Sequence, residues 1–167
     1  MPRKSLKACS RSAPARNRPG PQRVSFEELL RSADCLVLAA PLTPSTFHLL
    51  DRAALACMKP GAQFVNVGRG SVVDEVAVAE ARASGRLAGY AADVFEMEDL
   101  SRADRPREIP ALLLAQRERT VFTPHLGSAV TEVRKEIERA AALNIVDVLQ
   151  GRRPRNAVGM EVSSVST

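Results

Sequence analysis

The chain has 167 residues, of which 45% are hydrophobic and 26% charged, and its formal net charge is +5. A chain of this length can build one domain with a real hydrophobic core, but not two of ordinary size. Its strongest apolar run, CLVLAAPL at 35–42, is much shorter than the roughly 18 residues that a membrane helix needs. We therefore expect a single globular domain that has no membrane partner.

The positive charge belongs to the amino-terminal segment. Residues 1–23 hold seven basic side chains and no acidic one, whereas the remaining residues hold 17 basic and 19 acidic ones. This segment is rich in Pro, Ser and Arg, so we expect a disordered basic tail. It is open to three interpretations: weak contacts with nucleic acid or anionic lipid, a leader resembling a transit peptide, or a segment without function. We expect no other nucleic-acid contact.

The three cysteines argue for a reducing compartment. Cys9, Cys35 and Cys57 form no C-x-x-C pair, and an odd number of thiols cannot all be joined in disulfides. No signal peptide is visible either. We expect a cytoplasmic location.

Short apolar runs alternate with helical patterns after the tail. We expect strands at 35–41, 63–67, 87–95 and 120–124, and helices at 25–34, 51–58, 73–85 and about 128–150. This alternation predicts an α/β fold, in which helices cover both faces of a parallel sheet. The folded domain is expected to span 24–158, with a flexible C-terminus at 159–167.

Three candidate functional residues follow the predicted strands. Arg69 comes after the second strand, Glu98 after the third and His125 after the fourth. Ligands of parallel sheets bind at the carboxyl ends of the strands. An imidazole can take and return a proton, and a carboxylate on its second nitrogen fixes the tautomer. A guanidinium binds carboxylate or phosphorus oxyanions with paired hydrogen bonds. The alternatives are that His125 caps or packs at a helix start, and that Arg69 is a solvated turn residue.

Other residues near these positions carry weaker signals. Asp93 closes a strand, where it can accept hydrogen bonds or be an ordinary strand-end residue, and Arg134 lies either toward the site or on the surface of the last helix. His48 has no acidic neighbour in the sequence, so we expect it to be structural. The stretch GRGSVV at 68–73 matches the dinucleotide fingerprint G-x-G-x-x-G only in part, because Val73 replaces the third glycine, and it is not expected to bind pyrophosphate.

These motifs together resemble the NAD-dependent D-2-hydroxyacid dehydrogenase family over about residues 25–158. The stretches ADVFEMEDLSRADRPR and HLGSAVTEVRKEIERAA are most similar to its phosphonate (phosphite) dehydrogenase branch. Members specific for hydroxy acids usually have proline after the catalytic glutamate, whereas here Asp99 follows Glu98. The resemblance implies a partial Rossmann-like parallel sheet, the second half of a dinucleotide-binding domain, with a long C-terminal helix.

The resemblance also implies roles for individual residues. Arg69, Glu98 and His125 would be catalytic, and Arg69 with Arg134 would hold a small anionic substrate. The cofactor would be NAD, with NADP not excluded. The residues expected to touch it are Ala40, Pro41, Val67, Gly68, Asp93, His125, Leu126 and Gly127. The reaction would transfer hydride from phosphite to NAD, or, in the alternative, would act on a D-2-hydroxy acid.

Several family features have no counterpart in these 167 residues. They are the G-x-G-x-x-G loop, the acidic residue that binds the adenosine ribose, and a lysine of the substrate domain. We therefore expect part of an oxidoreductase that is active when its missing N-terminal half completes it. The apolar edge of the first strand would favour a homodimer or other self-association. The alternative from a different class is a non-catalytic fragment or interaction module.

Overall fold

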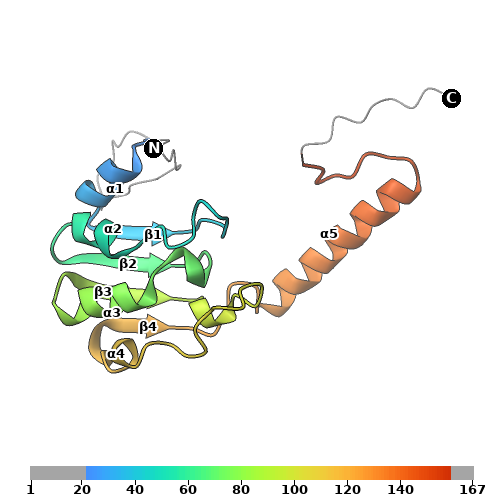
Figure 1. Ribbon diagram of the computed structural model, residues 1–167. Helices are drawn as coiled ribbons and strands as arrows, with labels where there is room; N and C mark the ends of the chain where they lie inside the picture. Colours follow the sequence, from blue (N-terminus) through green and yellow to red (C-terminus); the bar gives the residue numbers. More distant parts are fainter. Residues whose placement is uncertain (1–21, 159–167) are drawn as a thin grey trace. The chain divides into compact units, whose positions relative to one another are not determined.

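The computed structural model describes residues 22–158, which form two compact units within that range, 22–124 and 125–158 (Figure 1). The first unit contains the sheet, and the second contains one long helix. Most of the predicted basic tail, and the predicted flexible C-terminus at 159–167, lie outside the described residues.

The first unit alternates helices and strands as predicted. Its elements are α1 (Phe26–Ser32), β1 (Cys35–Leu38), α2 (Arg52–Cys57), β2 (Ala62–Asn66), η1 (Gly70–Val72), α3 (Glu75–Ala83), β3 (Leu87–Ala92), η2 (Glu96–Glu98), α4 (Ala111–Leu114), η3 (Arg117–Arg119) and β4 (Thr120–Phe122), where η marks a 3₁₀ helix. Every predicted strand is present, but each ends slightly earlier than its apolar run. The short helix α4 was not predicted, because four residues are too few for a periodic pattern.

Side-chain caps explain where the predicted helices begin. The Ser25 hydroxyl accepts a hydrogen bond from the N–H of Glu28 at 3.1 Å, and Asp51 and Asp74 cap α2 and α3 in the same way. Such caps satisfy backbone donors that a first helical turn leaves without partners. Gly85 ends α3 in the left-handed region, with φ 75°, which confirms it as a stop signal.

The four strands form one parallel sheet in the order β1-β2-β3-β4, so the α/β prediction is confirmed (Figure 1). Because all strands run in the same direction, their carboxyl ends meet at one edge of the sheet. The segments that follow β1, β2 and β3 therefore emerge side by side. This is the edge at which the candidate residues of the first unit were expected.

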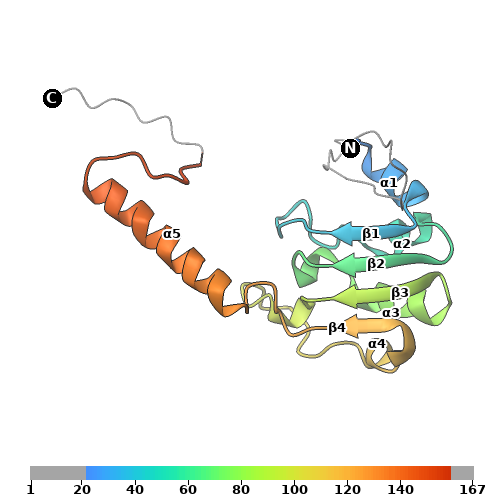
Figure 2. The ribbon, with the colours of Figure 1, turned by 180° about the vertical axis from the view of Figure 1, so that it is seen from behind.

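Within the described residues of the first unit, helices cover one face of this sheet, and coverage of the second face stays a prediction. Helices α2, α3 and α4 lie on the same side, and the opposite side of the strands is open in the first unit (Figure 2). Side chains alternate accordingly: Leu36 and Phe64 are buried on the helical face, whereas Val37 is 59% and Val121 63% exposed. Runs that are apolar throughout predicted two covered faces, but the described part of the first unit has no helices for the second.

The second unit contains α5 (Thr131–Leu149), whose side chains are largely exposed. The apolar stripe predicted for this helix is present but bare, with Val133, Ile137 and Val148 all exposed. One buried residue, Asp147, accepts hydrogen bonds from Arg152 and Arg155, which holds the chain after α5 against the helix. Within residues 22–158, no helix combines the length and hydrophobicity that crossing a bilayer requires.

Candidate functional site at the carboxyl edge of the sheet

A tight turn after β2 presents Arg69. The side chain of Asn66 is completely buried at the end of β2, and it accepts a hydrogen bond from the N–H of Gly68 at 3.1 Å. Its amide nitrogen donates to the carbonyl oxygen of Arg69 at 3.2 Å. The Arg69 guanidinium is exposed and donates to the carbonyl oxygen of Gly68 at 2.8 Å. Asn66 therefore shapes the turn from beneath, while Arg69 faces solvent.

Sequence reasoning missed Asn66. The available signal was its position, because it is a polar residue at an inward-facing place in the strand QFVNV. A buried carboxamide needs hydrogen-bond partners, and here the neighbouring turn supplies them.

The loops after β1 and β2 touch each other at Gly68. A β-carbon at this residue would lie 2.6 Å from the carbonyl oxygen of Ala40, so only glycine fits without movement. This contact brings together the four residues predicted to touch a cofactor in these loops, which are Ala40, Pro41, Val67 and Gly68. Ala40 is half-buried, while Pro41 and Val67 are exposed.

Asp93 and Glu98 follow β3 at the same edge. The N–H of Asp93 donates to the carbonyl oxygen of Asn66 at 3.0 Å, and its carboxylate accepts a hydrogen bond from the Thr123 hydroxyl. Glu98 is half-buried in η2 and accepts from the N–H of Phe95 at 3.0 Å. Asp93 is thus hydrogen-bonded to Asn66 at the base of the Arg69 turn. Glu98 is hydrogen-bonded to Phe95, within its own segment after β3.

The remaining predicted residues belong to the second unit. His125 is exposed and has a left-handed backbone, with φ 55°, a conformation that histidine adopts more readily than most residues other than glycine. Leu126 and Gly127 are exposed beside it, and Arg134, in the first turn of α5, donates to the carbonyl oxygen of Ser128 at 3.1 Å. The pairing of His125 with Glu98 stays a prediction.

His48 has an acidic partner, contrary to the expectation from the sequence. Its Nε2 lies 2.9 Å from Oε2 of Glu96, a residue 48 positions away that the fold brings beside it. The imidazole also stacks on the ring of Phe47, whose face carries the Arg102 guanidinium 3.8 Å from its centroid. Sequence proximity could not reveal this pair, because tertiary packing alone makes it.

Three buried acids lie where η1 and the start of α3 meet η2. Glu75, Glu96 and Asp99 are 1%, 7% and 9% exposed, and each accepts a hydrogen bond from a backbone N–H. Burial raises the pKa of Glu75 to about 7, with smaller upward contributions from the charges of neighbouring acids, Glu96 first. Burial likewise raises the pKa of the Tyr90 phenol above its ordinary range.

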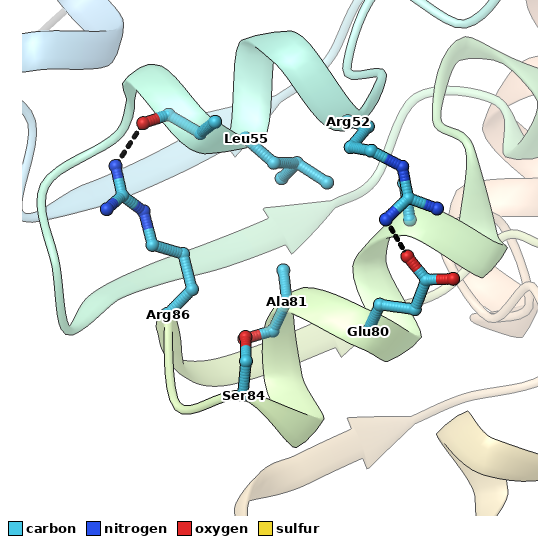
Figure 3. A pocket seen from close by; sticks show the side chains of 8 residues that line it. Arg52, Leu55, Glu80, Ala81, Ser84 and Arg86 are labelled. Carbon is cyan, nitrogen blue, oxygen red and sulfur yellow. Dashed lines mark hydrogen bonds and ion pairs between the residues drawn. The ribbon is translucent and has the colours of Figure 1, made fainter.

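A hollow of about 340 Å³ lies elsewhere, between α2 and α3 (Figure 3). Arg52 pairs with Glu80 on one side of it, and Arg86 donates to backbone carbonyls near the end of α2 on the other. Its lining includes Arg86, which precedes β3, so it lies toward the amino ends of the strands. Because its arginines are already engaged, we assign it no ligand.

Comparisons with known proteins define the class of this chain. The sequence profile described as "D-isomer specific 2-hydroxyacid dehydrogenase, NAD binding domain" matches residues 6–127, a range that begins within the predicted tail and ends beside His125. The chain therefore belongs to this family, and the family is an NAD-binding one. It is 41% identical over 138 residues to glyoxylate/hydroxypyruvate reductase B of Citrobacter koseri, covering 83% of this chain and 40% of the reductase. The chain thus spans about two fifths of the length of the curated relatives that it matches.

Solved structures agree with this class. A glyoxylate reductase from Paecilomyes thermophila is 33% identical with a TM-score of 0.71, and the match covers 80% of this chain and 38% of the reductase. A D-isomer specific 2-hydroxyacid dehydrogenase from Xanthobacter autotrophicus, in complex with NADPH and MES, is 33% identical with a TM-score of 0.63, covering 80% and 51%. The family resemblance is confirmed, whereas specificity for phosphite finds no support among these relatives.

Proposed function

We propose that this chain forms the nicotinamide side of an NAD(P)-dependent oxidoreductase that reduces small 2-oxo acids such as glyoxylate and hydroxypyruvate. The observation that carries the proposal is the Arg69 turn, which Asn66 holds at the carboxyl edge of the sheet beside Asp93. Curated relatives with this domain are glyoxylate/hydroxypyruvate reductases. A guanidinium at this edge matches the carboxylate that all 2-oxo acids carry.

The residues present fit the nicotinamide end of the cofactor. The close approach of Gly68 to Ala40 joins the loops after β1 and β2, where Pro41 and Val67 are exposed, and Asp93 lies at the same edge. Asp93 and the backbone around Val67 and Gly68 would hold the carboxamide end of the cofactor. When bound, the nicotinamide supplies the hydride.

The family resemblance supports a role for each of the chain's own residues. Arg69 binds the substrate carboxylate and so orients the adjacent carbonyl group. His125 donates a proton to the carbonyl oxygen as hydride reaches the carbonyl carbon, and it takes that proton back in the reverse direction. Glu98 on the second ring nitrogen would fix the tautomer and stabilise the imidazolium.

Phosphite oxidation is the second candidate, and Asp99 is the observation that favours it. The sequence suggested phosphite because Asp99 stands where hydroxyacid-specific members usually have proline. In the structure, its carboxylate accepts a hydrogen bond from the N–H of Ser71 at 2.7 Å. That bond gives Asp99 a structural role that is independent of substrate, so we rank phosphite below the 2-oxo acids.

The test measures NAD(P)-dependent turnover in two forms of the protein. One is the chain itself, and the other is a chimera in which residues 25–158 replace the matching segment of the Citrobacter koseri reductase. Oxidation of NADH and NADPH is followed with glyoxylate and hydroxypyruvate, and reduction of NAD with phosphite. We expect turnover of 2-oxo acids by the chimera.

Two variants of the chimera assign the roles. His125→Asn should lower kcat by a factor of about 10² to 10⁴, and Arg69→Gln should raise KM for the oxo acid by about tenfold or more. The exposed Arg117→Gln is the matched control and should change neither. A chimera that folds and binds NADH without turning over any of the three substrates would favour the non-catalytic interaction module instead.

Location and assembly belong to the same proposal. We infer a cytoplasmic protein, because Cys35 and Cys57 are free thiols and the reaction draws on the cell's nicotinamide pool. We also infer self-association, with a homodimer as its simplest form, since β1 is an edge strand of the described sheet and the face beside it is bare.

A further inference from the structure

The segment that carries Arg69 and the segment that carries Glu98 are locked together. Gly70, at the start of η1, packs directly on the peptide that joins Phe95 to Glu96, and no β-carbon could be accommodated there. The backbones of the loops after β2 and β3 are therefore in direct contact at this point. Neither the acid–base chemistry nor the cofactor contacts proposed above account for this packing.

Two carboxylates reinforce the contact by a reciprocal exchange. Oε1 of Glu96 accepts a hydrogen bond from the N–H of Glu75 at 2.9 Å, and Oε1 of Glu75 accepts from the N–H of Glu96 at 2.8 Å. We call this pair of bonds the carboxylate clasp. Next to it, Asp99 accepts from the N–H of Ser71, and His48 contacts the second oxygen of Glu96 at 2.9 Å.

Burying the two carboxyl groups of the clasp costs free energy, which suggests that the clasp has a specific role. Both carboxyl groups lie in the protein interior, where an acid without partners is strongly destabilising. An apolar pair could fill the same space without that cost, but it could not accept hydrogen bonds from the two backbone N–H groups. The geometry therefore assigns these acids the task of holding two backbone segments at a defined separation.

We propose that Glu75 and Glu96 are positioning residues, which keep the Arg69 turn in register with the η2 segment that bears Glu98. The functional part of this inference rests on the roles proposed above for Arg69 and Glu98. The clasp acts through oxygen acceptors, so a glutamine, which keeps an acceptor of the same reach, should replace either glutamate. Alanine removes the acceptor, and aspartate shortens it.

The test is hydrogen–deuterium exchange of the full chain, read by mass spectrometry. The variants are Glu96→Ala, Glu96→Asp, Glu96→Gln, Glu75→Ala and Glu75→Gln, with Glu80→Gln on α3 as the matched control. In the alanine and aspartate variants, amides at 68–73 and 94–100 should exchange at least about tenfold faster. The sheet peptides at 62–66 and 87–92 should keep the protection of the parent chain. Both clasp glutamine variants and the control should exchange no faster than the parent chain in any of these peptides.

Three outcomes would overturn the proposal. The first is unchanged exchange in the two loops of the alanine or aspartate variants. The second is loss of protection in the sheet together with the loops, which would make the clasp a general stability element. The third is a glutamine variant as open as alanine, which would assign the effect to charge. If an alanine variant does not fold, Glu96→Asp decides alone.

The exchange experiment is independent of turnover. Opening of the loops in a chain whose chimera is inactive would retain the clasp and reject the roles given to Arg69 and Glu98. Turnover by the chimera with no opening in the variants would reject the clasp and retain the proposed reductase.

Discussion

The buried carboxamide of Asn66 bonds to both sides of the turn that presents Arg69, accepting from Gly68 and donating to the Arg69 carbonyl oxygen. The sequence marked the arginine as functional, but the structure shows that the neighbouring asparagine determines where it is held. The conformation of the turn therefore depends on a side chain that is itself buried.

Replacing Asn66 with alanine should lower the free energy of unfolding by about 1–3 kcal/mol, because two backbone groups lose a partner and a cavity remains. It should also loosen amide exchange at residues 67–70. Urea unfolding and hydrogen exchange would measure the two effects. Gln63→Ala, on an exposed position of the same strand, is the control and should stay within about 0.5 kcal/mol of the parent chain. Equal stability of the two variants would contradict this role.

Replacing Gly70 with alanine should be more damaging than an ordinary glycine substitution. A β-carbon there would collide with the backbone of Phe95 and Glu96, which cannot move as a side chain can. We expect a loss of at least about 2 kcal/mol, or failure to fold. Gly89→Ala is the matched control, because a β-carbon at that position would meet its nearest neighbours at an ordinary 3.7 Å. Thermal denaturation of both variants would test the contrast, and similar melting temperatures would refute it.

The stability of the first unit should depend on pH through Glu75. Its pKa is about 7 in the folded chain, against an ordinary 4.5, because it is buried and its Oε2 has no hydrogen-bond partner among the described residues. The folded state thus binds this proton more tightly than the unfolded state. Binding of this proton adds at most about 3 kcal/mol to the free energy of unfolding. This stabilisation is fully present below pH 4.5 and is lost as the pH rises toward 7.

Glu75→Gln should remove that dependence, because glutamine accepts the same backbone hydrogen bond and cannot ionise. Urea unfolding at about pH 5 and about pH 8 should therefore show a gain for this variant mainly at the higher pH. Glu80→Gln is the contrasting control. Arg52 lowers the pKa of Glu80, so any stabilisation from that carboxylate is present at neutral pH and is lost toward low pH. An equal gain for Glu75→Gln at both pH values would contradict the assignment.

The bare sheet face should drive self-association. Val37 and Val121 are exposed on β1 and β4, on a surface that includes a hollow of about 440 Å³ around Val65 and Val121. Val121→Lys should shift the chain toward monomer in sedimentation velocity, because a buried lysine at an interface is costly. Val76→Lys, at an exposed position of α3, is the control and should leave association unchanged. A parent chain that stays monomeric would reject this interface.

Local patterns predicted the helices, strands and stop signals because their physical causes are local. The cap at Ser25 and the left-handed Gly85 act within a few residues of themselves, and both are present where the pattern indicated them. Parallel pairing followed from the alternation of strands and helices. With the family resemblance, these features sufficed to place Arg69, Asp93 and Glu98 after the strands of one sheet edge.

Tertiary packing alone decided what those residues contact. The pair of His48 and Glu96, the reciprocal bonds of Glu75 and Glu96, and the approach of Gly68 to Ala40 all join segments that are distant along the chain. The open sheet face of the first unit has a related explanation. An apolar run records that a strand is suited to burial on both sides, whereas burial itself depends on which other segments are there to pack against it. The hydrophobic pattern of the sequence determines which surfaces are suited to burial. The three-dimensional arrangement of the segments determines which of those surfaces are buried.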